Sequence, residues 1–214
     1  MMMNKTILAV MAALTISGCA NEPETYSDFR PEGKMGNTIN SPRYTGIKYV
    51  DAPVDLIVSD KRSYSHIAEV DDVSVEFMHI INSDKTLEEM YGQAVKDMLD
   101  RQGFSVYTRT APKKGEPTYE FLIKEYNVTA NHKDEVQATV VVDVKLLSAD
   151  GKSRFKQEFV GEAIFSPSSM PTRQELVNVL NRVSQDVLNQ IAKSKGVHRF
   201  ANTHFENNHP RKVL

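Results

Sequence analysis

The stretch from Val136 to Phe165, VQATVVVDVKLLSADGKSRFKQEFVGEAIF, decides the fold. Its first half alternates between apolar and polar side chains, the pattern of a strand with one buried face. The apolar side chains of that face belong to Val136, Ala138, Val140, Val142, Val144 and Leu146. Ala149-Asp150-Gly151 is a turn signal, after which the apolar face resumes at Phe155, Phe159, Ala163 and Phe165. The stretch predicts a long antiparallel hairpin that is half buried.

An amphipathic helix is expected directly after the hairpin. Thr172 and Glu175 form a capping box, in which each side chain satisfies a free backbone donor at the start of the helix. Apolar residues then recur at helical spacing: Leu176, Val179, Leu180, Val183, Val187, Leu188 and Ile191. This helix is predicted to end before Gly196, which would serve as its cap.

A second amphipathic helix is predicted upstream, over residues 87–102. Thr86-Leu87-Glu88-Glu89 is another capping box, and Gly103 stands where a left-handed residue would end the helix. Its apolar stripe consists of Leu87, Met90, Tyr91, Ala94, Val95, Met98 and Leu99. One face of this helix is therefore expected to cover a core.

Shorter strands complete the sheet. They are expected at 54–60, at 73–81, where Val73, Val75 and Phe77 face one way, at 104–107 and at 119–123. A sheet with one apolar face needs a helical cover. The fold class predicted is α+β, a two-layer α/β sandwich with a mainly antiparallel sheet and two amphipathic helices on one face.

The domain so defined spans residues 47–196. Residues 197–214 lack periodicity and are expected to form a polar, disordered tail. Residues 19–46 are rich in proline, glycine and polar residues and are predicted to be a flexible tether. An alternative for the tether is that part of it packs on the domain through Tyr26, Phe29 or Tyr44.

The first eighteen residues have the features of a secretion signal. Lys5 supplies a positive charge, and Thr6 to Ile16 is apolar but shorter than the roughly 20 residues that span a bilayer. Ile16-Ser17-Gly18-Cys19 follows, which resembles the lipobox of bacterial lipoproteins, and Cys19 is the sole cysteine of the chain. The lipobox implies that signal peptidase recognises Ile16, Ser17 and Gly18 and that Cys19 carries the acyl chains. An ordinary secretory signal with a chance cysteine is the alternative.

Several segments together resemble the YajG-like outer-membrane lipoproteins. They are the strand ending at Asp60 and Arg62, the sequence Gly103-Phe104-Ser105-Val106, the hairpin with Phe159-Val160-Gly161, and the final helix. The similarity covers residues 53–195. It implies an α/β domain anchored in the outer membrane, related in pattern to auxiliary lipoproteins of envelope transport systems. Residues 63–85 and the tail have no counterpart in this pattern.

Motifs for chemistry are scarce in the sequence. It has no Gly-rich phosphate loop, metalloprotease histidine pair or nucleophile elbow, so neither a cofactor nor a metal is expected. The acidic pairs are interpreted as solvated surface, and they are Asp71-Asp72, Glu88-Glu89 and Asp134-Glu135. The tail histidines His198, His204 and His209 have no regular metal-ligand spacing. Asp60 and Arg62 are expected to form a surface ion pair or a turn.

The net charge of the chain and its predicted export reduce the number of possible functions. With 26 basic and 28 acidic residues, the net charge of −2 argues against a nucleic-acid partner. Ala20 and Asn21 follow the lipidated cysteine, where Asp commonly retains such proteins at the inner membrane, so the periplasmic face of the outer membrane is the predicted location.

Three function hypotheses follow from these features. The first is a non-catalytic accessory or assembly factor, held in the membrane by acyl chains on Cys19, that binds an envelope protein partner. The second is a lipid- or glycan-binding module of an envelope transport system, which needs an apolar groove. The third, an enzyme, needs converging titratable groups. We expect no enzyme activity.

Overall fold

The computed structural model describes residues 34–35, 39–41, 49–72, 77–83, 85–130, 135–167 and 171–205. Its elements in chain order are β1 (Lys34–Met35), β2 (Ala52–Asp60), β3 (Ala68–Asp72), β4 (Phe77–Ser83), α1 (Leu87–Arg101), β5 (Phe104–Thr108), β6 (Thr118–Ala130), β7 (Val136–Leu147), β8 (Arg154–Phe165), α2 (Arg173–Lys193) and α3 (Lys195–His204).

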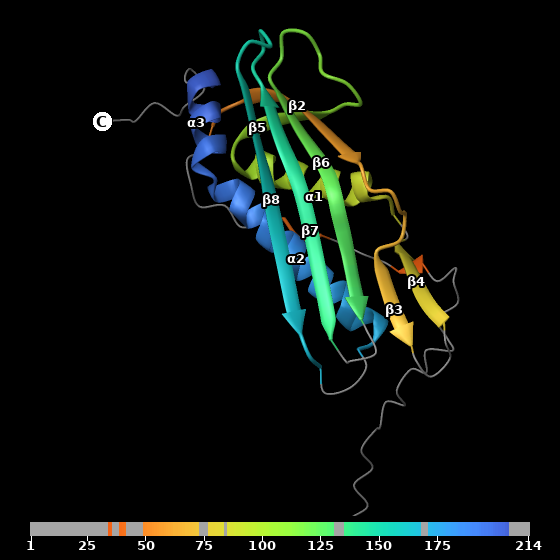
Figure 1. Ribbon diagram of the computed structural model, residues 1–214. Helices are drawn as coiled ribbons and strands as arrows, with labels where there is room; N and C mark the ends of the chain where they lie inside the picture. Colours follow the sequence, from red (N-terminus) through yellow and green to blue (C-terminus); the bar gives the residue numbers. More distant parts are fainter. Residues whose placement is uncertain are drawn as a thin grey trace, which may run out of the picture.

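The eight strands form one sheet in which β6 has strands on both of its edges (Figure 1). On one edge β6 pairs with β7, and β7 pairs with β8, both antiparallel along the whole strand. On the other edge β6 pairs in parallel with β2 through Thr118–Ile123 and with β3 through Val128–Ala130. β5 extends the sheet beyond β2 in parallel, and β4 extends it beyond β3 in antiparallel orientation. The longest pairings are antiparallel, as predicted.

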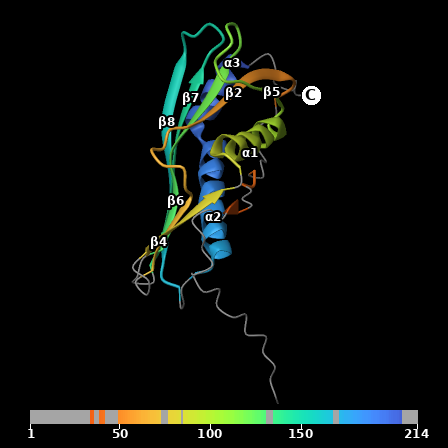
Figure 2. The ribbon, with the colours of Figure 1, turned by 90° about the vertical axis from the view of Figure 1, so that its right-hand side faces the viewer.

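Both long helices lie on the same face of the sheet (Figure 2). α1 packs on β2 and β5, while α2 packs on β7, β8 and β6. The apolar stripes predicted for the two helices are largely buried, and so are the side chains of β7 that face them. The two-layer α+β architecture is therefore confirmed.

The predicted helix starts are also confirmed. Both capping boxes are complete, with Thr86 and Thr172 accepting from the backbone of Glu89 and Glu175 and each glutamate accepting in return. Gly103 has a φ of 89° directly after α1. A Cβ at this position would lie 1.9 Å from the carbonyl oxygen of Tyr49, so the backbone approach as well as the left-handed conformation requires glycine.

The prediction of a disordered tail is wrong at its beginning. Ser194 ends α2 and is also the N-cap of α3, so Gly196 lies inside a helix and caps nothing. α3 buries Val197, Phe200 and Ala201. These side chains recur at helical spacing and cover a patch that the two predicted helices leave open. The domain thus extends to Phe205, which is 3% exposed.

Two further boundaries differ from the expectations. The second half of the strand predicted at 73–81 is β4, its first part, residues 73–76, lies outside the described residues, and β3 at 68–72 was not predicted. Within the predicted tether, Ile39 is 5% exposed and belongs to the main core, and β1 pairs with β4. The alternative in which part of this segment packs on the domain is therefore correct for Ile39.

Candidate functional site

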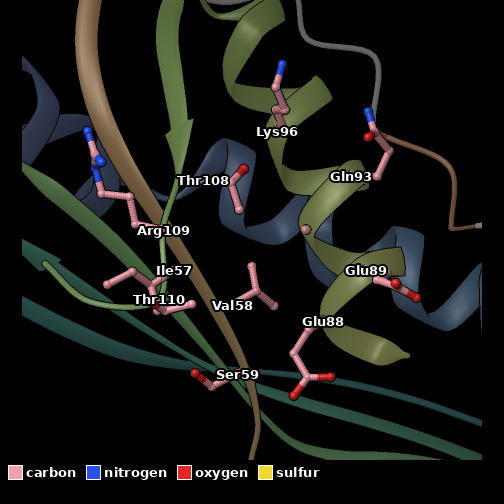
Figure 3. A pocket seen from close by; sticks show the side chains of 11 residues that line it. Ile57, Val58, Ser59, Glu88, Glu89, Gln93, Lys96, Thr108, Arg109 and Thr110 are labelled. Carbon is pink, nitrogen blue, oxygen red and sulfur yellow. The ribbon is translucent and has the colours of Figure 1, made fainter. Parts of the chain in front are cut away.

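An open groove of about 680 Å³ lies between α1 and the point where β5 ends beside β2 (Figure 3). Its lining side chains come from β2, α1 and the end of β5, and they are Ile57, Val58, Ser59, Glu88, Glu89, Gly92, Gln93, Lys96, Thr108, Arg109 and Thr110. The volume is in the range of small-ligand sites, and the exposed lining is more apolar than polar, as in those sites. Ile57 and Val58 are the large aliphatic side chains in the lining, and the other lining residues, apart from Gly92, have hydroxyl, amide or charged side chains.

The groove exists because β5 is shorter than β2. The two strands pair from Ala52 with Phe104 to Leu56 with Thr108, and the backbone of Arg109 makes the last bond, to the carbonyl oxygen of Leu56 at 2.9 Å. Beyond it the chain turns into the loop over residues 109–117. The remainder of β2, residues 57–60, has β6 on one side and the groove on the other.

Asp55 fixes the turn that opens the groove. Its side chain is fully buried and accepts from Nε of Arg109 at 2.5 Å and from the backbone N–H of Lys113 at 3.0 Å. The hydrogen bond with Asp55 raises the pKa of the Arg109 guanidinium above its ordinary value. Arg109 is charged, as arginines in proteins always are, and its position at the end of the groove is set by a buried carboxylate.

The backbone of Val58 faces this groove. Backbone groups of successive strand residues point to opposite sides, and Asp55 and Lys61 bond toward β6. Leu56, Val58 and Asp60 consequently point the other way. The C=O of Leu56 is used by Arg109, and the N–H of Asp60 donates to Oε1 of Glu88 at 2.9 Å. Val58 lies between Leu56 and Asp60, at a level where β5 has already ended. Among the described residues, no neighbouring strand pairs with its backbone on this side.

The charged side chains around the groove already have partners. Glu88 holds the Asp60 backbone, Glu89 belongs to the capping box of α1, and Lys96 pairs with Asp100 at 2.6 Å. Nothing in this set resembles a nucleophile with its base. The arrangement is suited to recognition through backbone and hydroxyl groups, the latter from Ser59, Thr108 and Thr110.

Comparison with known proteins assigns the chain to a protein family. A family model described as uncharacterized lipoprotein matches residues 46–201 of the chain. The chain belongs to this lipoprotein family. The predicted resemblance to a lipoprotein family is thereby confirmed, while the specifically YajG-like grouping stays a prediction. No curated protein sequence matches the lipoprotein significantly.

Solved structures are similar to the lipoprotein at low sequence identity. Protein XCC0632 from Xanthomonas campestris matches with a TM-score of 0.59 and 11% identity, covering 80% of the lipoprotein and 99% of that chain. Lipoprotein GNA1162 from Neisseria meningitidis matches with a TM-score of 0.38 and 12% identity, covering 67% and 100% of the two chains. The first likeness shows a shared fold, and the second is too weak to support an argument.

The predicted lipidation site lies outside the described residues. This applies to Ile16, Ser17, Gly18 and Cys19 and to the whole signal segment 1–18. In the part of the lipoprotein that the structure describes, no helix is long and apolar enough to cross a bilayer. Attachment through Cys19 therefore stays a prediction.

Of the two expectations for Asp60 and Arg62, the turn is confirmed, because the backbone N–H of Arg62 donates to Oδ1 of Asp60 at 3.0 Å, whereas the ion pair is not a surface pair. They bind each other at 2.8 Å, but the Arg62 side chain is only 2% exposed and also donates to the carbonyl oxygens of His66 and Tyr126, at 2.7 and 3.0 Å. Arg62 thus satisfies backbone acceptors where the chain crosses from β2 to β3. The pair is structural and is not part of the groove lining.

The other residues considered for chemistry are dispersed in the lipoprotein. His198 and His204 lie on α3 and are partly buried, and His209 is outside the described residues. Among the described residues, no group of three or more His, Cys, Asp or Glu is arranged to hold a metal ion. Glu88, Glu89 and Glu135 are exposed, as the surface interpretation predicted, and the side chains of Asp71, Asp72 and Asp134 are not described.

The groove itself was not predicted from the sequence. Its position depends on how far β5 extends along β2, which is a register between segments that are distant in sequence. One local signal was available in Gly92, which lies in the interior of α1. Helix interiors disfavour glycine, so its presence at position 92 indicated a place where a neighbour or a ligand approaches α1.

Proposed function

We propose that this lipoprotein is a non-catalytic, lipid-anchored envelope factor that binds an extended segment of a partner protein in the groove between α1 and β2. The observation that carries the proposal is the backbone of Val58, whose N–H and C=O face an open groove beyond the end of β5. An extended segment can add to such an edge by pairing its own backbone with it.

The groove chemistry favours a peptide over an acyl chain. Ser59, Thr108 and Thr110 bring hydroxyl groups to the walls, and an acyl chain would leave these groups without water or a partner. A peptide offers donors and acceptors at regular intervals beside Val58. Gln93 and Thr108, on opposite walls, could then bind the peptide from two sides.

Gly92 allows the proposal to be tested without damage to the fold. A Cβ at this position meets only a methyl group of Val58, at 4.0 Å, so a longer side chain extends into the groove. Gly92→Gln should keep or raise stability, because glycine is disfavoured in helices by about 1 kcal/mol relative to alanine. Gly92→Ala is the matched control, since it makes the same backbone change with little filling.

The measurement is photo-crosslinking in intact cells from a probe at Thr108, with Lys152 on the distant hairpin turn as the reference position. We expect one specific protein adduct from Thr108, which is kept in Gly92→Ala and lost in Gly92→Gln at equal abundance. An adduct that survives Gly92→Gln would refute the groove as the binding site. Loss in both variants would show that the backbone change, and not the filling, is responsible.

The location of the anchor is part of the proposal. Acyl chains on Cys19 would hold the protein in the outer membrane with the domain in the periplasm, because Ala20 and Asn21 lack the acidic inner-membrane signal. On a density gradient we expect the protein with outer-membrane fractions and an Ala20→Asp variant shifted toward inner-membrane fractions. Recovery of the unchanged protein with the inner membrane would contradict the assignment.

A further inference from the structure

β8 has one free edge within the described part of the chain. All twelve of its residues pair with β7, and no strand lies on its other side. The C=O of Val160 accepts a hydrogen bond from Nε2 of Gln190 on α2 at 3.1 Å, so it is not used by β7. Even-numbered residues of β8 therefore direct their backbone groups away from the sheet, and odd-numbered residues direct theirs toward β7.

Exposed apolar side chains gather on this edge strand. Val160 is 41% exposed, Ile164 62% and Phe165 38%, and they are three of the five large apolar residues exposed in the described part of the molecule. Natural proteins usually protect a long edge strand with bulges, prolines, charged side chains or coverage. β8 does carry charges, but they are of both signs and exclude only strands whose charges do not match. β8 contains no proline and its pairing with β7 is regular throughout, so it is suited to pair with another strand.

The charges along β8 identify the complementary strand as another β8. Its beginning carries Arg154 and Lys156, and its later part carries Glu158 and Glu162. A strand with opposite charges at its two ends is complementary to a copy of itself in antiparallel orientation, because the basic half of each lies beside the acidic half of the other. We propose that two copies of the lipoprotein associate through their β8 strands.

The charges also select the register of this pairing. With the two-fold axis at Phe159, Lys156 of each copy lies opposite Glu162 of the other, and Arg154 lies opposite Ile164. All of these are even-numbered residues, so their free backbone groups meet as hydrogen-bonded pairs. The two-fold symmetry produces the Lys156 to Glu162 pair twice.

Neighbouring registers are less favourable. An axis at Glu158 pairs Arg154 with Glu162 but places the Glu158 carboxylate against its own copy, and an axis at Val160 places Glu158 against Glu162. Like charges directly opposite on adjacent strands are destabilising. An axis at Gln157 pairs Lys156 with Glu158 but leaves Glu162 and Ile164 beyond the end of the shared ladder.

The helical layer fits the same two-fold arrangement. α2 crosses the sheet diagonally, from the end of β6 toward the start of β8, where α3 follows (Figure 1). The end of β8 receives less cover, and Phe165 is exposed there although its strand position places it on the helical side. The axis at Phe159 brings α3 of the second copy to this end.

The dimer leaves the proposed peptide groove open. β8 is one edge of the sheet and the groove lies at the other, beside the end of β5. Each sheet would continue into the other through β8, with the two grooves at the outer ends. Dimerisation and peptide binding are therefore separable by experiment, and neither inference depends on the other.

The test measures the mass of the mature, full-length lipoprotein in detergent by sedimentation over a concentration series. We expect a dimer that Glu162→Lys and Lys156→Glu each weaken at least about tenfold, because each variant creates two like-charge pairs across the axis. A mixture of the two variant chains restores opposite charges at both positions, and so does the double variant. Glu162→Gln, which adds no repulsion, is the matched control.

A second variant tests the backbone contact. Gln190→Ala frees the Val160 carbonyl for the other strand and should strengthen the dimer. Lys156 also pairs with the buried Asp143 of its own chain at 3.1 Å, so Lys156→Glu should lose folding stability as well, and Glu162→Lys, at an exposed position, is the primary variant. Circular dichroism confirms that each variant is folded. A protein that is monomeric at all concentrations would overturn the proposal, and so would a dimer that is indifferent to both charge reversals. Recovery of the dimer in the mixed chains would establish the antiparallel register.

Discussion

Position 103 requires glycine for two reasons, its backbone conformation and the absence of space for a side chain. Its φ of 89° is the left-handed conformation, and the carbonyl oxygen of Tyr49 occupies the place where a Cβ would stand. The same Tyr49 donates its backbone N–H to the carbonyl oxygen of Gln102 at 2.6 Å. A side chain at Gly103 would therefore displace the segment that leads into β2, and with it the aromatic contact between Tyr49 and Phe104.

Gly103→Ala should lower the free energy of unfolding by more than the conformational penalty of roughly 1–2 kcal/mol. Gly115→Ala is a matched control, because Gly115 has a φ of 90° but nothing within 4 Å of a Cβ. Chemical denaturation of both variants separates the clash from the backbone strain. Equal losses in the two variants would show that Tyr49 moves aside freely.

Asp143 makes the stability of the protein depend on pH. Its side chain is 4% exposed on β7 and pairs with Lys124 and Lys156, both at 3.1 Å. Burial raises the pKa of Asp143, but the hydrogen bonds and charges of Lys124 and Lys156 outweigh it and hold the pKa below its ordinary value. The stabilisation is therefore present above the unfolded-state pKa of about 3.9 and is lost as the pH falls through the folded-state value.

Asp143→Asn should be less stable than the parent at pH 7 by roughly 1.5–3 kcal/mol, the range for hydrogen bonds to charged groups. The difference should shrink below about pH 4, where the parent carboxylate also becomes protonated. Urea unfolding from pH 7 to pH 3 measures this, with Asp186→Asn on the exposed face of α2 as control. A difference that stays constant with pH would assign the loss to packing.

At the scale of elements, the long amphipathic segments could be predicted from the sequence. The β7–β8 hairpin, α1 and α2 each have a clear apolar period, and capping boxes mark where the two helices start. α3 was missed because Gly196 resembled a helix terminator. Ser194, as the N-cap, together with the spacing of Val197, Phe200 and Ala201, was the signal that could have identified it.

The groove and the buried role of Arg62 were beyond the reach of sequence patterns. Both depend on strands that are far apart in the chain and meet only in the fold. Arg62 contacts the carbonyl oxygen of Tyr126, and the groove depends on where β5 ends along β2. Local patterns specify which face of an element is apolar. They do not specify how far two distant strands overlap.

α3 should prove essential to the fold, contrary to the tolerance expected of a disordered tail. Phe205 packs edge-on against Phe104 with ring centroids 5.1 Å apart, and Tyr49 donates its hydroxyl to Asn202 at 2.7 Å. Phe205→Ala should cost about 3–5 kcal/mol, as for other buried phenylalanines. Thr203→Ala, at an exposed position of α3, should change stability by less than about 0.5 kcal/mol. Thermal unfolding that is unaffected by Phe205→Ala would contradict the extended domain boundary.

At the scale of the whole molecule, three different parts of the sheet serve the core, the proposed dimer and the proposed peptide site. Its apolar face packs against the helices and supplies the core, the β8 edge is proposed to pair with a second copy, and the opposite edge opens into the groove proposed to bind a peptide. The face away from the helices is polar, with Asp143, Lys124, Lys156 and Glu158 in one network. Folding uses side chains of the edge strand β8, such as Phe159 and Lys156, but no described strand pairs with its outer backbone edge.

Loss of the lipid anchor should leave folding, dimerisation and peptide binding unchanged, because the described core lies within residues 39–205. Cys19→Ser should lose radioactive fatty-acid label and membrane association, while its unfolding temperature, dimer mass and crosslinking from Thr108 in solution stay unchanged. The physical reason is that each buried methylene contributes about 0.8 kcal/mol to membrane attachment, so several acyl chains hold a protein that would otherwise dissociate. Labelling of both forms to the same extent would rule out Cys19 as the lipidated residue. A Cys19→Ser protein that loses its fold along with its label would show instead that the anchor supports the domain.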